Sequence, residues 1–413
     1  MALNVKVGNF AAATSTGSQA ITGVGFLPKI VIFFYTGRTT SGAGAVSSRC
    51  TGWGAFDGTN EVCNGLAIDD GASHSADRAN NDKVVRLFDR ANTTLSEADG
   101  TSLDADGFTI NWSTNDATAY LIGYLALGGS DITNAVAGSM IIGTGSTTSE
   151  TIGFAADGLI FGGADGATSF PATGNSILGI GVATGVLSTE QHAISGRKRH
   201  GSNTTFSGYD SGRCWVAGDD SATPNQEYHV STIDSTSFTL TKDVGGTNQA
   251  ALIYVAIAGA QFEQGVFQSP NATTGTQTVS GLGFDPVAVL FDSGCHTGAD
   301  TYSAEYNIAM GAMSGATEEF CIGQFHTDTN LHDETAKTDK ALSIYTAGTP
   351  TLDEEFEFSS FGTTQFVINW TTSHANQNRI GWLAIGAAVA GGATGKSNPL
   401  SGPFGGPFSG PLG

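Results

Sequence analysis

The chain has 413 residues, of which 58 are glycine and only 13% are charged. This length allows two or three domains, each large enough to bury a core, and the abundance of glycine, threonine and serine favours turns and strands over surface helices. The formal net charge of −21, from 17 basic and 38 acidic residues, disfavours binding to nucleic acid or to an anionic membrane.

The first candidate strand lies at residues 30–34, where Ile-Val-Ile-Phe-Phe follows Pro28. Such a run of β-branched and aromatic side chains is typical of a buried strand. The stretch that follows carries Gly, Ser, Asp and His without a strict pattern, so we expect mainly loops there, with at most a short helix over residues 75–86. Residues 104–107, Asp-Ala-Asp-Gly, predict a turn.

Two further strands follow this turn. In residues 108–112 a period of two places Phe108, Ile110 and Trp112 on one face of a strand. Residues 120–127 form the next apolar run, and the polar residues 113–118 between the two predict a hairpin connection. The sequence therefore predicts an all-β fold of antiparallel β-sandwich type.

These blocks recur near the end of the chain. Phe26 and Phe284 head the first matched pair and are 258 residues apart (284 − 26). Three blocks share this spacing: 17–33 with 275–291, 108–112 with 366–370, and 122–128 with 380–386. A constant offset over three blocks indicates a tandem repeat.

Half of this spacing, 129 residues, predicts a middle copy. Residues 152–161, 237–241 and 252–258 match the same blocks at offsets of 128 to 130 residues, although this copy has lost the proline and the tryptophan. We therefore predict three tandem β-sandwich domains and a tail. Their expected bounds are 1–129, 130–260 (the divergent copy), 261–390, and 391–413 for the Gly/Pro-rich tail.

The tail repeats a proline every four residues, each followed by a large apolar residue. The four pairs are Pro399 with Leu400, Pro403 with Phe404, Pro407 with Phe408, and Pro411 with Leu412. A disordered terminus is one interpretation, because Gly/Pro-rich ends are usually flexible. The regular apolar spacing favours a peptide that docks on a neighbouring subunit, where each buried side chain would contribute roughly 1.5–3 kcal/mol before ordering costs.

Residues that could carry chemistry are few. The five cysteines (Cys50, Cys63, Cys214, Cys295 and Cys321) are odd in number and show no metal-ligand spacing, so we expect no disulfide framework, and the equivalent pair Cys63 and Cys321 predicts small core residues. His74 and His332 are also equivalent (332 − 74 = 258) and lie among acids. A metal site there is an alternative to solvated loops, which we favour because no regular ligand spacing is present.

Other motifs point away from catalysis. Residues 104–107 resemble the start of a calcium loop, but the later acid is missing. No catalytic motif is present, so we expect no enzyme, no metal and no cofactor. The chain start has no apolar stretch behind a basic region, which predicts synthesis without a signal peptide, in a cytoplasm, and no apolar run approaches the roughly 18 residues that span a bilayer.

Two groups are candidates for binding. The basic run Arg197, Lys198 and Arg199 is either a solvated loop or a contact for an acidic neighbour or an anionic glycan. Trp53 and Phe56 are candidates for stacking on sugar rings, in a glycan-binding interpretation that places loops at residues 51–57 and 309–314. At the matching places the other copies have the apolar residues of a core strand, namely Met310 and Met313 in the third and Ile180 and Val182 in the second.

With its early Phe-Leu-Pro strand (residues 26–28) and its late Gly-Phe-Thr-Ile-Asn-Trp and Ile-Gly-Tyr-Leu-Ala-Leu-Gly-Gly strands, the chain resembles structural proteins of tailed-bacteriophage virions. The order of these strands also resembles the six-stranded H-type lectin sandwich, which assembles as trimers. That resemblance implies that three copies in one chain form a covalent pseudo-trimer.

The resemblance implies a non-enzymatic virion protein, assembled in the host cytoplasm. It would decorate the capsid or form part of a head fibre, tail fibre or tail tip that takes part in host attachment. The expected partners are other virion proteins, in many copies and in a symmetric assembly. The alternative is a carbohydrate-binding adhesin or receptor-binding module that recognises a host-surface glycan.

Overall fold

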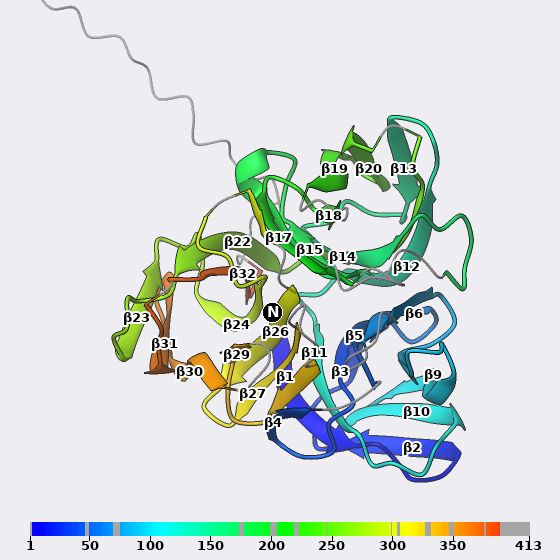
Figure 1. Ribbon diagram of the computed structural model, residues 1–413, viewed down its shortest axis with the longest axis horizontal. Helices are drawn as coiled ribbons and strands as arrows, with labels where there is room; N and C mark the ends of the chain where they lie inside the picture. Colours follow the sequence, from blue (N-terminus) through cyan, green and yellow to red (C-terminus); the bar gives the residue numbers. More distant parts are fainter. Residues whose placement is uncertain are drawn as a thin grey trace, which may run out of the picture.

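The computed structural model of the chain is built almost entirely of β-strands (Figure 1). It describes residues 2–45, 49–68, 75–172, 177–198, 205–218, 223–245, 247–298, 300–303, 306–326, 332–346, 351–375 and 377–388. Within these ranges the helical structure is a single 3-10 turn, η1 (Ser188–Glu190). The expected tail at 391–413 lies outside the described residues.

The first domain is a sandwich of two antiparallel sheets. Its six-stranded sheet has the order β1 (Leu3–Ala11), β11 (Leu121–Gly129), β3 (Pro28–Tyr35), β5 (Arg49–Phe56), β6 (Glu61–Ile68) and β7 (Ser75–Asn80). Its four-stranded sheet has the order β2 (Gly17–Thr22), β10 (Gly107–Thr114), β9 (Thr94–Asp104) and β8 (Val85–Phe88).

The second domain repeats this arrangement. Its larger sheet contains β12 (Asn134–Ile142), β21 (Ala250–Ala258), β14 (Gly158–Asp165), β15 (Ile177–Ala183), β16 (Gln191–Lys198) and β17 (Thr205–Ser211), and its seventh strand is β25 (Thr301–Ser303) of the third domain. The smaller sheet contains β13 (Thr147–Thr151), β20 (Ser237–Val244), β19 (Pro224–Ile233) and β18 (Trp215–Gly218).

The third domain has the same two layers. Its larger sheet contains β22 (Gln261–Gln268), β32 (Arg379–Gly386), β24 (Pro286–Ser293), β26 (Tyr306–Gly315), β27 (Glu318–His326) and β28 (His332–Lys337), and its seventh strand is β4 (Gly42–Ala45) of the first domain. The smaller sheet contains β23 (Gly275–Ser280), β31 (Gln365–Thr372), β30 (Thr351–Gly362) and β29 (Leu342–Thr346).

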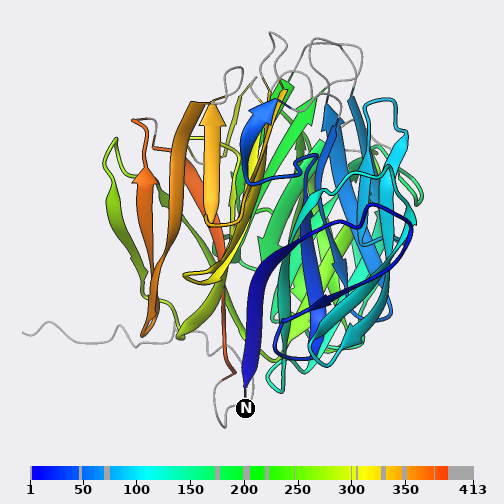
Figure 2. The same ribbon diagram turned by 90° about the horizontal axis from the view of Figure 1, so that it is seen from below.

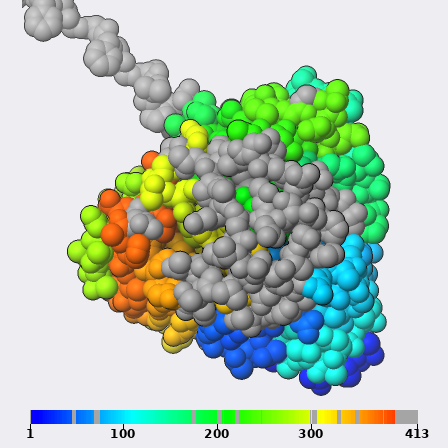
Figure 3. Space-filling model, viewed as in Figure 1, coloured from blue at the N-terminus to red at the C-terminus, as the bar shows by residue number. Residues whose placement is uncertain are grey.

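The three sandwiches surround a common axis, with the larger sheets inside and the four-stranded sheets at the periphery (Figure 1). The space-filling view shows the same arrangement as three lobes (Figure 3). Each sandwich has its own core, and a fourth core joins all three domains through residues such as Ile32, Ile253 and Leu290. The inner strands are therefore buried on both faces, whereas β10 alternates between buried and half-buried residues.

The domains contact one another in a cyclic order. Strand β4 of the first domain pairs with β28 of the third, and β25 of the third pairs with β17 of the second. The second domain closes the cycle through a single bridge, in which Ala172 pairs with Ala79 of the first domain. Each domain thus extends the sheet of the preceding one, as in a closed heterologous ring.

The first and last described residues, Ala2 and Ala388, lie with both linkers at one end of this body, the end marked N in Figure 2. The Ala388 amide donates to Asp131 Oδ2 (3.1 Å), and the Asp131 amide donates to Ala2 O (3.4 Å). Gln261, just after the second linker, donates its side-chain amide to Ala387 O (2.6 Å). We call this end the base.

Three equivalent glycines bring the two layers of each sandwich into close contact. A Cβ at any of them would lie 2.0–2.1 Å from a backbone carbonyl oxygen in the segment that leads into the smaller sheet. The glycines and the residues carrying those oxygens are Gly54 with Val84, Gly181 with Cys214, and Gly311 with Ala341. The fold therefore requires glycine at this position of every copy.

Several sequence predictions on the fold are confirmed. The segments 30–34 and 108–112 lie in β3 and β10, and the predicted strand 120–127 lies in β11 from residue 121 on. Phe108, Ile110 and Trp112 are fully buried, and residues 104–107 turn from β9 into β10. Cys63 and Cys321 are buried core residues, and all five cysteines are free.

Other predictions on the fold are wrong. The segment 75–86 contains β7 and the start of β8, not a helix, because its apolar residues are buried between layers. Residues 113–118 do not form a hairpin, since β10 and β11 belong to different sheets. The stretch expected to be mainly loops also holds strands β5 and β6.

Candidate functional site

The two aromatic residues expected to bind sugar do not reach the surface. Trp53 is 0% exposed and Phe56 is 2% exposed. Trp53 Nε1 donates to Gly179 O (3.2 Å) across the boundary between the first and second domains. The prediction of a sugar-stacking role is therefore wrong for both rings, which pack in β5 as core residues, as do Met310 and Ile180 in the other copies.

The basic run of the second domain is only partly described. The Arg197 guanidinium donates to Gly218 O (2.7 Å), and Lys198 is 1% exposed at the end of β16. Lys198 is therefore not the solvated side chain that the sequence suggested. Arg199 lies outside the described residues.

The paired histidines also differ from expectation. His332 begins β28 and is fully buried, with Nε2 3.4 Å from Glu334 Oε1, so the expected solvated loop is wrong for this copy. Its counterpart His74 lies outside the described residues, as do all eight predicted docking residues of the tail. Glu334 also reaches the first domain, where its Oε2 accepts the Gly37 amide (2.6 Å).

The structure brings together a buried polar pair that the sequence did not indicate. At the boundary of the second and third domains, His192 Nε2 lies 2.8 Å from Asp292 Oδ2, and the two residues are 0% and 1% exposed. His192 Nδ1 lies 2.5 Å from Gln264 Oε1, while the Gln264 amide group donates to Thr189 O (2.7 Å). Because that second bond orients the Gln264 oxygen toward the ring, both ring nitrogens face acceptors, which favours the imidazolium.

The electrostatics of His192 agree with this geometry. Burial lowers its pKa, but the Asp292 carboxylate and the two hydrogen bonds outweigh burial and hold the pKa above its ordinary value. Asp292 Oδ1 has no hydrogen-bond partner among the described residues, and a Cβ on Gly381 would lie 2.4 Å from it. The pair is therefore enclosed on that side by a glycine.

The other two domain boundaries are apolar at this place. Strand registers make His192 equivalent to Phe320 and Val62, and Asp292 equivalent to Phe34 and Gly162. Phe320 packs against Gly123, as His192 does against Gly381. The equivalent positions of the other two boundaries thus pack without charged side chains.

Two further histidines, His326 and His296, are buried near domain boundaries. The ring centroid of His326 lies 6.3 Å from that of His332, and neither ring nitrogen of His326 has a hydrogen-bond partner among the described residues. Burial, together with the charge of Lys198, lowers the pKa of His326 to about 3. Burial also lowers the pKa of His296 to about 4, and its Nε2 lies 3.1 Å from Ser207 Oγ of the second domain.

A polar groove of about 400 Å³ opens between the first and second domains, where β6 and β12 lie side by side (Figure 1). It is lined by Asn60, Glu61, Val62, Asn81, Val136, Ala137, Gly138, Ser139, Glu150, Thr151, Ile152 and Tyr254. Glu150 accepts the Tyr254 hydroxyl (2.9 Å), and Glu61 accepts the Gly100 amide. The lining contains two carboxyl groups and no basic side chain.

Both carboxyl groups of the groove are shifted toward the neutral form. Burial raises the pKa of Glu61 to about 7, and burial also raises the pKa of Glu150. Glu319, the counterpart of Glu61 in the third domain (319 − 61 = 258), accepts the Phe358 amide, and burial raises its pKa to about 8. The carboxyl of Glu61 therefore has a structural role, whereas Glu150 has no acidic counterpart.

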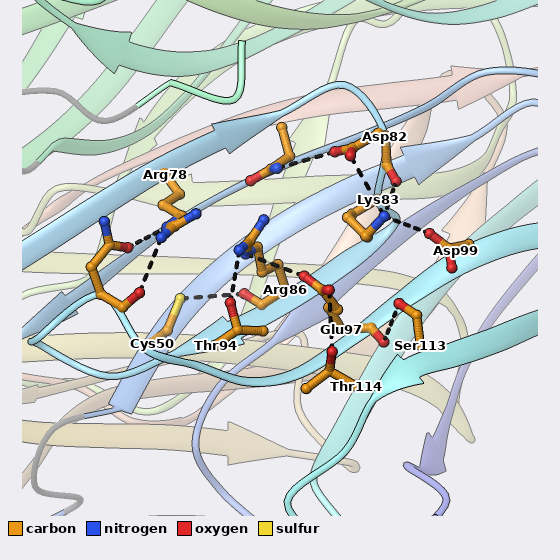
Figure 4. A network of polar contacts seen from close by, with 12 residues as sticks. Cys50, Arg78, Asp82, Lys83, Arg86, Thr94, Glu97, Asp99, Ser113 and Thr114 are labelled. Carbon is orange, nitrogen blue, oxygen red and sulfur yellow. Dashed lines mark hydrogen bonds and ion pairs between the residues drawn. The ribbon is translucent and has the colours of Figure 1, made fainter. Parts of the chain in front are cut away.

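A further network of charges lies within the first domain, among β7, β8, β9 and β10 (Figure 4). Arg86 Nε lies 3.4 Å from Glu97 Oε2, and Lys83 Nζ lies 2.7 Å from Asp99 Oδ1. These ion pairs link β8, and the segment just before it, to β9 of the smaller sheet.

No protein-family model matches the chain, and comparison with curated proteins finds no match. Among the residues that the structure describes, no group of three or more His, Cys, Asp or Glu side chains is arranged to hold a metal ion. The described segments include no helix with the length and hydropathy needed to cross a membrane. The interpretation of function therefore rests on the domain boundaries, the base and the groove.

Proposed function

We propose that this chain is a non-enzymatic structural protein of a bacteriophage virion, carried on the particle surface. The observation that supports this most directly is that Ala2, Ala388 and both linkers lie together at the base. Ala388, the last described residue, lies at the base, so attachment there would leave the opposite end of the body free.

The shared core supports a mechanical role. Residues of all three domains pack around the axis, and strands cross two of the three boundaries. Such contacts resist relative motion of the domains, because moving one would expose apolar surface of the other two. A body of this kind suits a capsid decoration, a head fibre, or a tail fibre or tip component.

The described surface offers little apolar area for attachment. Its exposed large apolar side chains are Leu27, Val186, Leu187 and Val244. Stable interfaces generally need a larger apolar centre. In this proposal the apolar residues of segment 391–413 supply that centre by docking on neighbouring virion proteins.

Deletion of residues 391–413 tests the proposal. We expect the truncated protein to fold but to be lost from washed, DNA-filled particles, and Phe404→Ser with Phe408→Ser to weaken incorporation in the same direction. Leu187→Ser, which removes an exposed apolar side chain of the body, serves as the control and should incorporate normally. Unchanged incorporation of the truncated protein would contradict the anchoring role.

The alternative is a carbohydrate-binding adhesin. It loses the two aromatic side chains on which it depended, because Trp53 and Phe56 are buried. A glycan array with the full chain still separates the two proposals. Sugar binding by a protein that is absent from purified particles would favour the adhesin and overturn the structural role.

A further inference from the structure

The three domain boundaries differ in the contacts that close them near the base. At the boundary of the third and first domains, Lys6 Nζ lies 2.6 Å from Glu318 Oε1. At the boundary of the second and third domains, the Gln264 amide donates to Thr189 O. In each case a side chain from the first strand of one domain reaches the neighbouring domain and closes the boundary.

At the boundary of the first and second domains, no side chain of the first strand makes such a contact among the described residues, and the Ala137 amide of β12 instead donates to Asp57 Oδ2 of the first domain (3.0 Å). Strand registers make Val136 equivalent to Lys6, and the sequence offset makes Asn60 equivalent to Glu318 (318 − 60 = 258). A valine facing an asparagine cannot form the ion pair, and the groove of about 400 Å³ lies at this place, lined by both residues. The groove is therefore the position at which another boundary of the same molecule holds an ammonium group.

The second domain also adds an acid to this groove. Glu150 pairs with Phe238 in the strand register, as Ile21 pairs with Phe108 and Val279 with Phe366. An apolar residue thus satisfies the fold in the other two copies. The glutamate at this position is not required by the sandwich, and its carboxylate, held by the Tyr254 hydroxyl, borders the groove.

We propose that this groove binds an alkylammonium group, that is, a primary amine carried on a short aliphatic chain. The carboxylates of Glu61 and Glu150 supply the negative charge, and Val136 and Ile152 contact the aliphatic part. The lysine side chain of a partner polypeptide and a free diamine both have this chemistry. The site does not depend on the proposed virion role, because its argument uses only this groove and the equivalent boundaries.

Calorimetric titration of the full chain tests the site and separates the two sources. The probes are the peptide acetyl-Gly-Lys-Gly-amide, the same peptide with norleucine in place of lysine, and 1,5-diaminopentane. We expect the lysine peptide or the diamine to bind at one site, and the norleucine peptide not to bind. Tighter binding of the peptide identifies a partner lysine, and tighter binding of the diamine identifies a free amine.

Two variants place the binding in the groove. Glu150→Val adopts the apolar side chain of the other copies, so it should fold and should weaken amine binding at least ten-fold. The double variant Asn60→Glu with Val136→Lys recreates the pair formed by Lys6 and Glu318, and it should abolish binding by filling the groove. Ser149→Ala, next to Glu150 on β13 but outside the groove lining, should bind as the unmodified chain does.

Proton exchange gives an independent readout. The charges of Asp99, Lys83 and Asp82 act on the Glu61 carboxyl, and binding of a cation should release the proton that burial retains on this carboxyl near neutral pH. We therefore expect amine affinity to rise from pH 6 to pH 8. The site is refuted if neither amine binds better than the norleucine peptide, or if Glu150→Val leaves the affinity unchanged while its thermal stability stays normal.

Discussion

We expect that removing one member of the buried pair His192 and Asp292 destabilises the protein, whereas replacing both members by apolar residues does not. The single variant His192→Phe introduces the residue found at the equivalent position, Phe320. It leaves the Asp292 carboxylate at 1% exposure without its cationic partner. Removing one member of a buried ion pair costs about 3–5 kcal/mol, because the remaining charge is neither solvated nor paired.

The double variant His192→Phe with Asp292→Phe should behave differently. It gives this boundary the two phenylalanines of the boundary between the third and first domains, where Phe34 pairs with Gly123 in the strand register and Phe320 packs against Gly123; Gly381 stands in the place of Gly123. Replacing a buried pair by packed apolar residues is commonly neutral or stabilising by about 1–4 kcal/mol. The loss of a hydrogen bond to Gln264 would subtract about 1 kcal/mol from that gain.

Urea unfolding followed by tryptophan fluorescence measures these differences, with calorimetry to test that the chain unfolds in one transition. The pH dependence provides a second measure. Because the folded pKa of His192 is raised, its contribution to stability is complete below the unfolded value of about 6.5 and is lost as the pH rises through the folded value. The double variant should lose this dependence.

Two results would refute the reasoning. A cost below about 1 kcal/mol for His192→Phe would mean that Asp292 is not held as a buried charge. If the double variant loses as much unfolding free energy as its two single variants together, the packing of this boundary requires the polar pair. The apolar residues at the other boundaries would then not predict what this position tolerates.

Three further predictions concern stability. Alanine at Gly54, Gly181 or Gly311 should lower the free energy of unfolding by more than about 2 kcal/mol or prevent folding. As a control, Gly143→Ala should cost less than about 1 kcal/mol, because a Cβ there would have nothing within 4 Å. Thermal unfolding measures both effects. The low folded pKa values of His296 and His326 mean that stability falls as the pH drops below about 6.5, by on the order of 3–5 kcal/mol for each residue once the pH reaches the folded value, and His326→Phe should reduce this acid sensitivity. Glu319 has the opposite effect on the pH dependence of stability. Its folded pKa is about 8, so its contribution to stability is complete below the unfolded value of about 4.3 and is lost as the pH rises toward 8. Glu319→Gln should therefore make the melting temperature decrease less between about pH 5 and pH 9.

The fold was largely predictable because its outer strands keep a clear pattern. Residues 108–112 alternate since β10 has one face toward a core, and the spacing of 258 residues identified the repeat. Strands β5 and β6 were not predicted, because both of their faces are buried and their sequences therefore do not alternate between apolar and polar residues. The glycine shared by the three copies, at Gly54 in β5, was the available signal, since a position that every copy keeps small marks a close approach.

The site was predicted poorly because it belongs to contacts between copies. The sequence predicted a surface position for Trp53, whereas the ring is buried and donates to Gly179 O of the second domain. A boundary between copies cannot be deduced from a single repeat. A comparison of the copies held a usable signal. Asp292 stands where Phe34 stands in the first copy, and Glu150 where the register places Ile21, so polar residues replace apolar ones at positions that the fold buries.

The meeting of Ala2, Asp131 and Ala388 at the base has a consequence for the order of the domains along the chain. In a closed ring with three similar joints, Ala2 and Ala388 occupy one joint and the linkers occupy the other two. A circularly permuted chain that starts at the first linker, with a short peptide joining Ala388 to Ala2, would keep every strand pairing described above. The three domains thus form a closed ring, and the fold does not require the chain to begin at one particular boundary of the three.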